Sequence, residues 1–219
     1  MTGTARARKL IATADSLSND SLALERYLEA VAMLNPLMEA GQGTAANLLY
    51  FRSHRKAGSR LISLGRPERS AALFDSLFPS LKKELGAGHP EVEKYLIDFS
   101  KAYYKGGRVT QQGIERYRQF LEEFQRPEAE SPKLAGLCHQ IIGTLFQQQY
   151  KYAESFPHLE KARSILQPLA RTNNDSVVLS DVYNNLGVCY AVEGDLYAGI
   201  EYFQKALGLR DHAIISYPK

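Results

Sequence analysis

Residues 180–209 decide the fold; they read SDVYNNLGVCYAVEGDLYAGIEYFQKALGL. The stretch contains two segments in which apolar residues recur at helical spacing, and a Gly-Asp turn separates them. Gly187 and Gly199 occupy positions 8 and 20 of the stretch, and Phe203 occupies position 24. Because two helices approach closely only where the facing side chains are small, the pattern predicts a hairpin of two packed helices.

The same pattern fits four further places upstream, with position 1 at residues 4, 51, 93 and 136. Through the five copies position 20 reads Ala, Ser, Gly, Ser, Gly, once an extra residue is allowed in the turn of the third copy. Position 24 reads Tyr, Phe, Tyr, Leu, Phe, and the first copy departs most because Ile11 replaces the small residue at position 8. Such helix pairs cannot bury their apolar faces alone, so stacking of neighbours must supply the core.

This pattern of Leu-Gly, an aromatic residue, a small residue, an aromatic residue and Ala resembles the tetratricopeptide repeat (TPR). The resemblance covers nearly the whole chain. Position-8 residues lie 42 to 47 residues apart, which exceeds the standard period of about 34 residues. Gly88-His89-Pro90-Glu91-Val92, at one junction between copies, resembles the kinesin-light-chain type of this repeat. The resemblance implies an all-α solenoid of about five helix-turn-helix repeats that form a right-handed superhelix.

We therefore expect a single repeat domain over residues 1–219, with repeats at about 4–44, 45–88, 89–130, 131–174 and 175–210. Helices are expected at about 5–17, 20–39, 45–64, 67–84, 90–105, 109–126, 132–148, 151–170, 176–193 and 196–209, and no strand is needed. Pro67, Pro90 and Pro132 suit the first turn of a helix. Asn19-Asp20-Ser21 and Asn174-Asp175-Ser176 match the glycosylation sequon, but we interpret both as helix caps.

The composition is that of an ordinary globular protein, with 44% hydrophobic and 23% charged residues. No apolar run is long enough for a transmembrane helix, and the first 20 residues lack the apolar core of a secretory signal. We expect no membrane association and a cytoplasmic location. Cys138 and Cys189 have no metal or redox spacing, so two reduced core thiols are favoured over a disulfide.

Charge is distributed unevenly although the net charge is only +3. Residues 1–110 hold 16 Lys and Arg against 11 Asp and Glu, whereas residues 111–219 hold 11 against 13. The first half therefore favours acidic partners. The small total and the acidic second half argue against nucleic acid binding.

No motif for phosphate, metal or nucleophilic chemistry is present, so we expect no enzyme, no cofactor and no metal site. Cys138 and His139 are neighbours in sequence and would point about 100° apart on a helix, which excludes a thiol–imidazole pair. His54 and His139 both fall at motif position 4, a packing position, and are interpreted as inter-helix packing residues.

In the TPR family, positions 2, 5, 9, 12 and 13 of the first helix line a concave groove and commonly meet a bound peptide. The resemblance therefore implies a groove that is basic toward the amino end and rich in amides toward the carboxyl end. We expect it to bind an acidic protein or peptide segment, against the alternative that these side chains are only a solvated surface. The expected groove residues are Arg52, Arg55, Lys94, Lys101, Tyr104, Lys105, Gln140, Gln148 and Asn184.

The expected function is a protein–protein interaction scaffold. An alternative is that the chain is the sensory or regulatory portion of a larger bacterial protein and controls an attached or associated effector domain, such as a protease, a kinase or a regulator. Repeat arrays need a polar capping helix at each end, and no further amphipathic helix is evident after Ala206. Either Asp211 to Tyr217 folds back as a short cap, or the sequence has been cut from a longer one. A coding sequence that continues past Lys219 would favour the regulatory alternative.

Overall fold

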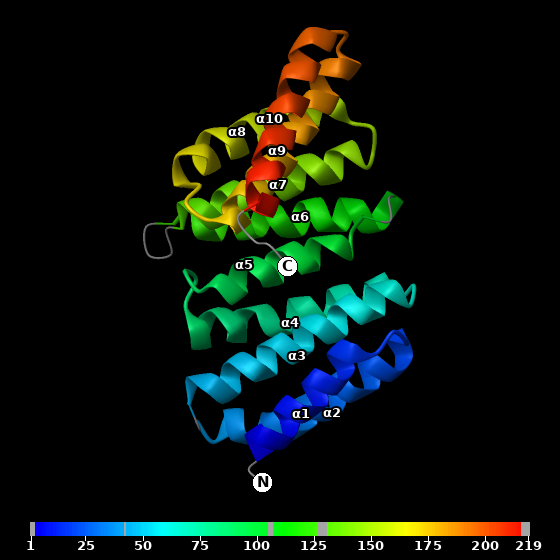
Figure 1. Ribbon diagram of the computed structural model, residues 1–219, viewed down its shortest axis with the longest axis vertical. Helices are drawn as coiled ribbons and strands as arrows, with labels where there is room; N and C mark the ends of the chain where they lie inside the picture. Colours follow the sequence, from blue (N-terminus) through cyan, green and yellow to red (C-terminus); the bar gives the residue numbers. More distant parts are fainter. Residues whose placement is uncertain (1–2, 42, 105–106, 127–130, 216–219) are drawn as a thin grey trace. The chain divides into compact units, whose positions relative to one another are not determined.

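The computed structural model describes residues 3–41, 43–104, 107–126 and 131–215 (Figure 1). Within these ranges the chain forms ten α-helices and one short 3-10 helix, and no strand. The all-α repeat prediction is confirmed. The contacts divide the chain into two compact units, residues 1–105 and 106–219, which we describe separately. The single-domain assignment and the handedness of the superhelix stay predictions.

Unit 1 (residues 1–105) contains five helices, each packed against the next along the chain. The first helices of successive repeats also contact each other directly, since α3 contacts both α1 and α5. This side-by-side arrangement sets their polar side chains opposite each other. The helices are α1 (Gly3–Ser16), α2 (Asp20–Glu39), α3 (Thr44–Ser63), α4 (Pro67–Leu85) and α5 (Pro90–Lys101).

In unit 2 (residues 106–219) each helix again packs against the next along the chain. The first helices of its two complete repeats, α7 and α9, also contact each other directly. Two predicted ends were wrong: α5 ends at Lys101, not near residue 105, and α10 continues to Ile215, beyond residue 209. The helices are α6 (Gly107–Phe124), α7 (Pro132–Gln147), α8 (Tyr152–Leu166), α9 (Asn173–Val192) and α10 (Leu196–Ile215), with the 3-10 helix Gln167–Leu169 after α8.

The small residues at position 8 lie where predicted, at the crossing of the two helices of a repeat. A Cβ atom built on Gly58 would lie 2.5 Å from the ring of Phe74, the residue at position 24 of the same repeat. A Cβ atom on Gly187 would lie 2.7 Å from the ring of Phe203. The position-24 side chain therefore rests on the bare backbone of the first helix.

The serines at position 20 have a role that the sequence did not reveal. Ser70 Oγ donates a hydrogen bond to the carbonyl oxygen of Gly58 at 2.8 Å, and Ser155 Oγ donates to that of Gly143 at 2.8 Å. Both serines are buried. The hydroxyl thus fastens the second helix to the first at their closest approach.

Helix starts follow the sequence signals, with one exception. Pro67, Pro90 and Pro132 each occupy the first turn of a helix, and Asn19 caps α2 by accepting a hydrogen bond from the amide of Leu22. Of the expected cap residues 174–176, Asp175 does have a capping role, but the N-cap itself is Thr172: α9 begins at Asn173, and Thr172 and Asp175 form a capping box.

Cys138 and Cys189 are both buried and free, as the reduced-thiol interpretation predicted. Burial raises the pKa of the Cys138 thiol far above its ordinary value. Burial also raises the pKa of the Cys189 thiol, so neither cysteine has the lowered pKa that is typical of a reactive thiol. Across the described residues, no helix has the length and apolarity needed to span a membrane.

Candidate functional site

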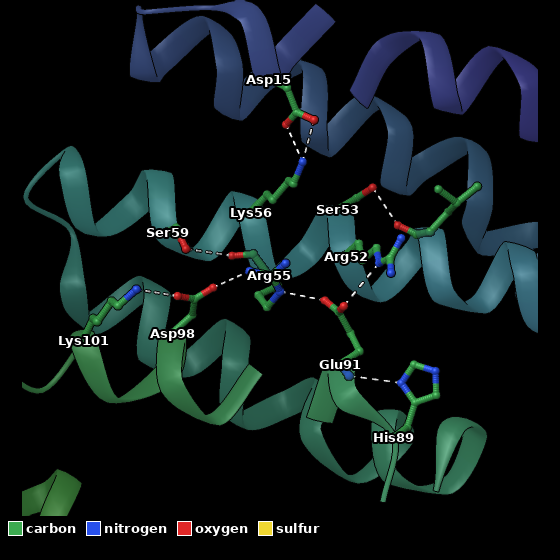
Figure 2. A network of polar contacts seen from close by, with 11 residues as sticks. Asp15, Arg52, Ser53, Arg55, Lys56, Ser59, His89, Glu91, Asp98 and Lys101 are labelled. Atoms are coloured by element: carbon green, nitrogen blue, oxygen red, sulfur yellow. Dashed lines mark hydrogen bonds and ion pairs between the residues drawn. The ribbon is translucent and has the colours of Figure 1, made fainter. Parts of the chain in front are cut away.

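The predicted basic residues of the first half gather on the face that α3 and α5 share in unit 1. Arg55 of α3 lies between two carboxylates of α5, as Figure 2 shows. Its Nε donates to Glu91 Oε1 at 2.6 Å, and its terminal NH1 donates to Asp98 Oδ2 at 2.5 Å. The side chain of Glu91 is only 2% exposed and that of Arg55 18% exposed. Arg55 therefore joins two helices within the protein.

The electrostatics of Arg55 reflect this enclosure. Burial would lower the pKa of the Arg55 guanidinium, but hydrogen bonds to Glu91 and Asp98 outweigh burial and raise the pKa above its ordinary value. Removing one member of a buried ion pair leaves an uncompensated charge, which typically costs about 3–5 kcal/mol. Arg55 is thus held in place and is poorly placed to exchange its partners for a ligand.

The other cations of this face are more exposed. Arg52 Nε lies 3.2 Å from Glu91 Oε2, and its side chain is 45% exposed. Lys101 Nζ lies 2.7 Å from Asp98 Oδ1, and its side chain is 50% exposed. Lys94, at the same motif position as Arg52, is also exposed. Four cations thus accompany two carboxylates, and the surplus charge lies on the exposed side chains.

The ladder of ion pairs continues from α3 to the first repeat. Lys56 Nζ lies 2.5 Å from Asp15 Oδ1, and Arg60 NH1 lies 2.6 Å from Asp20 Oδ1. Tyr27 donates its hydroxyl proton to Asp15 at 2.5 Å, and burial followed by this hydrogen bond raises the pKa of Tyr27 to about 12. An open pocket of about 270 Å³ lies here, lined by Asp15, Tyr27, Lys56, Ser59, Arg60 and Ser63.

In unit 2 the predicted amide-rich positions join α7 to α9. Gln147 Nε2 donates to the carbonyl oxygen of Asn185 at 2.8 Å, and Asn185 Nδ2 donates to Thr144 Oγ1 at 2.8 Å. Gln140 is buried and donates to the same Thr144 hydroxyl at 3.2 Å. These amides bond the protein's own helices, so Gln140 offers little to a peptide.

The remaining predicted groove residues have different surroundings. Gln148 and Asn184 are exposed, and the backbone N–H of Gln148 donates to the carbonyl oxygen of Thr144 at the end of α7. The Tyr104 hydroxyl lies 2.9 Å from Ser100 Oγ in unit 1. Lys105 lies outside the described residues.

The histidines singled out in the sequence pack between side chains. His54 is buried, and its ring centroid lies 4.5 Å from that of Tyr50. His139 Nδ1 lies 3.0 Å from Nδ1 of His158, and burial with the nearby His158 and Lys161 lowers the pKa of His139 to about 4. In the described ranges no three His, Cys, Asp or Glu side chains gather as metal ligands.

The carboxylates that pair with Arg52, Arg55 and Lys101, namely Glu91 and Asp98, were not predicted from the sequence. Glu91 and Asp98 lie seven residues apart, so they share one face of α5 after two helical turns. Lys94 and Lys101 each follow one of these carboxylates by three residues, which is the spacing of a helical ion pair. That spacing was a usable signal that the basic row is partly neutralised.

Solved structures with the same arrangement of helices are TPR-like repeat proteins. BtubC (BKLC) from P. vanneervenii is 17% identical over 99% of this chain and 90% of its own, with a TM-score of 0.61. A putative kinesin light chain with nearly identical TPR-like repeats from Podosopora anserina is 15% identical over 96% of this chain and 97% of its own, with a TM-score of 0.52. MamA is 13% identical over 88% and 93%, with a TM-score of 0.51.

These likenesses confirm that the chain has the TPR-like helical-repeat fold. No protein-family model matches the sequence, and no curated protein matches it.

Proposed function

We propose that this chain is a protein-interaction scaffold without enzymatic activity, and that the α3–α5 face of unit 1 binds an acidic segment of another protein. The observation that carries the proposal is the surplus of positive charge on exposed side chains of this face, Arg52, Lys94 and Lys101. TPR-like relatives of the fold support a scaffold role by analogy only.

The buried and exposed cations have different tasks in this proposal. Arg55 is held by Glu91 and Asp98, so it fixes the spacing of α3 and α5 and does not itself meet the ligand. The Arg52 and Lys101 side chains are about half-exposed, whereas the carboxylates that they contact, Glu91 and Asp98, are largely buried and are also held by Arg55. A partner's carboxylates can therefore reach the two cations from the solvent side. The exposed Gln148 and Asn184 of unit 2 remain candidate contacts to a peptide backbone.

The proposal predicts that neutralising the exposed cations weakens binding to an acidic peptide. The variant is Arg52→Gln, Lys94→Gln and Lys101→Gln together, and the probe is a fluorescent oligoglutamate peptide measured by anisotropy. We expect an affinity loss of about tenfold or more, and wild-type binding that weakens with added salt. Arg55 is left intact because its loss would disturb the fold.

A matched control distinguishes the effect of this face on binding from the effect of the protein's net charge. Lys9, Arg69 and Lys83 are exposed on α1 and α4 of the same unit, and changing all three to Gln alters the net charge equally. The control should bind within about twofold of wild type. Equal losses in both variants, or no binding by the wild type, would contradict the acidic-ligand proposal.

The regulatory alternative stays a prediction. In it, binding to the same face would control an effector domain. A coding sequence that encodes such a domain together with residues 1–219 would favour it.

A further inference from the structure

Two imidazole side chains meet across one repeat of unit 2. His139 lies on α7 and His158 on α8, and their Nδ1 atoms are 3.0 Å apart. The ring centroids lie 5.2 Å apart, and both side chains are half-buried, so solvent reaches the pair. Because the two residues are 19 positions apart and on different helices, no short sequence motif indicated them.

The packing of the repeat does not by itself require histidines here. His139 and His158 occupy positions 4 and 23 of their repeat. At the same positions of the next repeat, Tyr183 and Tyr202 face each other with ring centroids 5.9 Å apart. Rings without a metal-binding nitrogen therefore fill the corresponding space, whereas the α7–α8 repeat brings two such nitrogens together.

The backbones that carry the two histidines are closely packed. His139 precedes Gly143 by one helical turn, and His158 lies between Ser155 and Leu159. Ser155 Oγ donates a hydrogen bond to the carbonyl oxygen of Gly143 at 2.8 Å, and a Cβ atom on Gly143 would lie 2.7 Å from the Leu159 side chain. The spacing of α7 and α8 beside the pair is thus fixed, which preorganises the two rings.

The distance between the two Nδ1 atoms suits neighbouring ligands of one metal ion. Zn–N bonds of about 2.0–2.1 Å place two ligand nitrogens about 2.8–3.4 Å apart at angles of about 90–109°. The observed 3.0 Å lies within this range. Each ring must turn about its Cβ–Cγ bond, a torsion with broad preferences, to direct its lone pair at a shared ion. The ring that donates its Nδ1 proton in the present hydrogen bond then carries that proton on Nε2, as the other neutral tautomer.

We propose that His139 and His158 together bind a divalent transition-metal ion such as Zn²⁺, with water completing its coordination. Imidazole nitrogen suits Zn²⁺, Cu²⁺ and Ni²⁺, whereas Mg²⁺ and Ca²⁺ prefer oxygen ligands. The ion would link α7 to α8 and stabilise the folded form of unit 2, to which it binds. The site lies in unit 2 only, so it is independent of the acidic-peptide proposal for unit 1.

Two nearby cations limit the affinity of this site. Lys161 acts electrostatically on His139, and Arg118 acts on His158. Since like charges repel, both cations oppose a dication, and we expect weaker binding than at closed sites with four protein ligands. Lys161 is exposed, so removing its charge leaves the packing of α8 undisturbed.

Isothermal titration calorimetry with zinc chloride tests the proposal on the 219-residue chain, purified without a histidine tag. The wild type should bind one ion per chain. His139→Asn and His158→Asn each place an amide near the former Nδ1 and remove a ligand, and each should weaken binding by at least about tenfold. Lys161→Gln should tighten binding by roughly twofold or more, because one opposing charge is lost.

The matched control is His89→Asn in unit 1. This change also removes an imidazole, but Asn is a favoured cap and can replace the cap that His89 provides to α5. The control should bind Zn²⁺ as the wild type does, and circular dichroism checks that every variant keeps its helicity. Electron paramagnetic resonance of bound Cu²⁺ should show two nitrogen ligands in the wild type and one in either α7 or α8 variant.

Three results would overturn the proposal. The first is a wild type that shows no saturable Zn²⁺ binding up to millimolar concentration. The second is wild-type affinity in both His139→Asn and His158→Asn, which would place the ion elsewhere. The third is an equal loss in His89→Asn, which would indicate unspecific binding to histidines. None of these results bears on peptide binding by unit 1.

Discussion

At the scale of single residues, the close packing of the two helices of a repeat depends on a residue without a Cβ atom, as at Gly58. Phe74 is fully buried, with its ring centroid 4.8 Å from that of Tyr95 and 5.4 Å from that of Phe99. It has no room to move away from a larger residue at position 58. The sequence predicted this requirement because close helix packing restricts side-chain size directly.

Gly58→Ala should therefore destabilise unit 1. The added Cβ would lie 2.5 Å from Cε2 and 2.7 Å from Cζ of Phe74. We expect the free energy of unfolding to fall by about 1–3 kcal/mol, as overpacked cores do, although Ala normally favours a helix by about 1 kcal/mol over Gly. Urea denaturation followed by circular dichroism measures the change.

Gly208→Ala is the matched control for this prediction. Gly208 lies within α10, and a Cβ there would meet nothing within 4 Å. Helix propensity alone then applies, so this variant should be stabilised by up to about 1 kcal/mol. If both variants shift in the same direction, steric contact with Phe74 is not the cause.

His54 is a buried packing residue, as predicted, but burying its imidazole costs stability at low pH. Both ring nitrogens of His54 are buried without a hydrogen-bond partner, and burial lowers the pKa of His54 to about 4 from 6.5. The unfolded chain therefore binds a proton at a pH where the folded chain does not. Stability from this group is fully present above about pH 6.5 and is lost as pH falls toward 4.

His54→Phe should flatten the pH dependence between pH 6.5 and 4. The pKa difference corresponds to a loss on the order of 3 kcal/mol in the wild type over this range. His139 and His158 also have lowered pKa values, so they still contribute to the pH dependence of stability in the variant. Thermal melts at several pH values measure the slope, and an unchanged slope would contradict a neutral, buried His54.

At the scale of helices, periodicity placed all ten described helices but located some ends poorly. Helix ends depend on single hydrogen bonds, and several neighbouring residues can provide them. Around residue 174 the sequence offers Thr, Asn, Asn and Asp in succession, all of them suitable caps. The structure selects Thr172, since Asp175 then accepts hydrogen bonds from the amides of Arg171 and Thr172.

Asp175 also joins α9 to α7. Lys133 Nζ lies 2.5 Å from Asp175 Oδ1. Burial would raise the pKa of the Asp175 carboxyl, but Lys133 and the backbone amides outweigh burial and lower the pKa to about 2. Its contribution to stability is present above about pH 3.8 and is lost only as pH falls toward 2, below the range in which His54 acts.

Thr172→Ala should destabilise unit 2 by about 1 kcal/mol, because the amide of Asp175 loses the side-chain oxygen that caps it. Thr172→Ser keeps that oxygen and should remain close to wild type. Guanidinium denaturation of both variants measures the difference. Equal stability of the Ala and Ser variants would place the cap elsewhere.

At the scale of the whole molecule, some charged side chains pair within the protein and others stay exposed to partners. The motif positions alone did not distinguish the two groups. Of the predicted groove cations, Arg55 is held by the carboxylates of α5. Lys56 and Arg60 of α3, which were not predicted as groove residues, pair with Asp15 and Asp20 of the first repeat. In unit 2, amides and hydroxyls link α7 and α9 instead. Only the exposed remainder of each set is available to partners, which is why the proposed peptide contacts are fewer than the motif positions imply.

The sequence by itself determined the helical repeat, its crossing points and most of its helices, because periodicity, capping and side-chain size act over a few residues along the chain. The tertiary structure alone decided which charges are already paired and which apolar face stays open. Arg55 meets Asp98 across 43 residues of sequence, and the apolar side chains of Leu196, Ile200 and Leu207 on α10 stay exposed. Contacts between distant residues depend on how helices stack, so local pattern could not predict them.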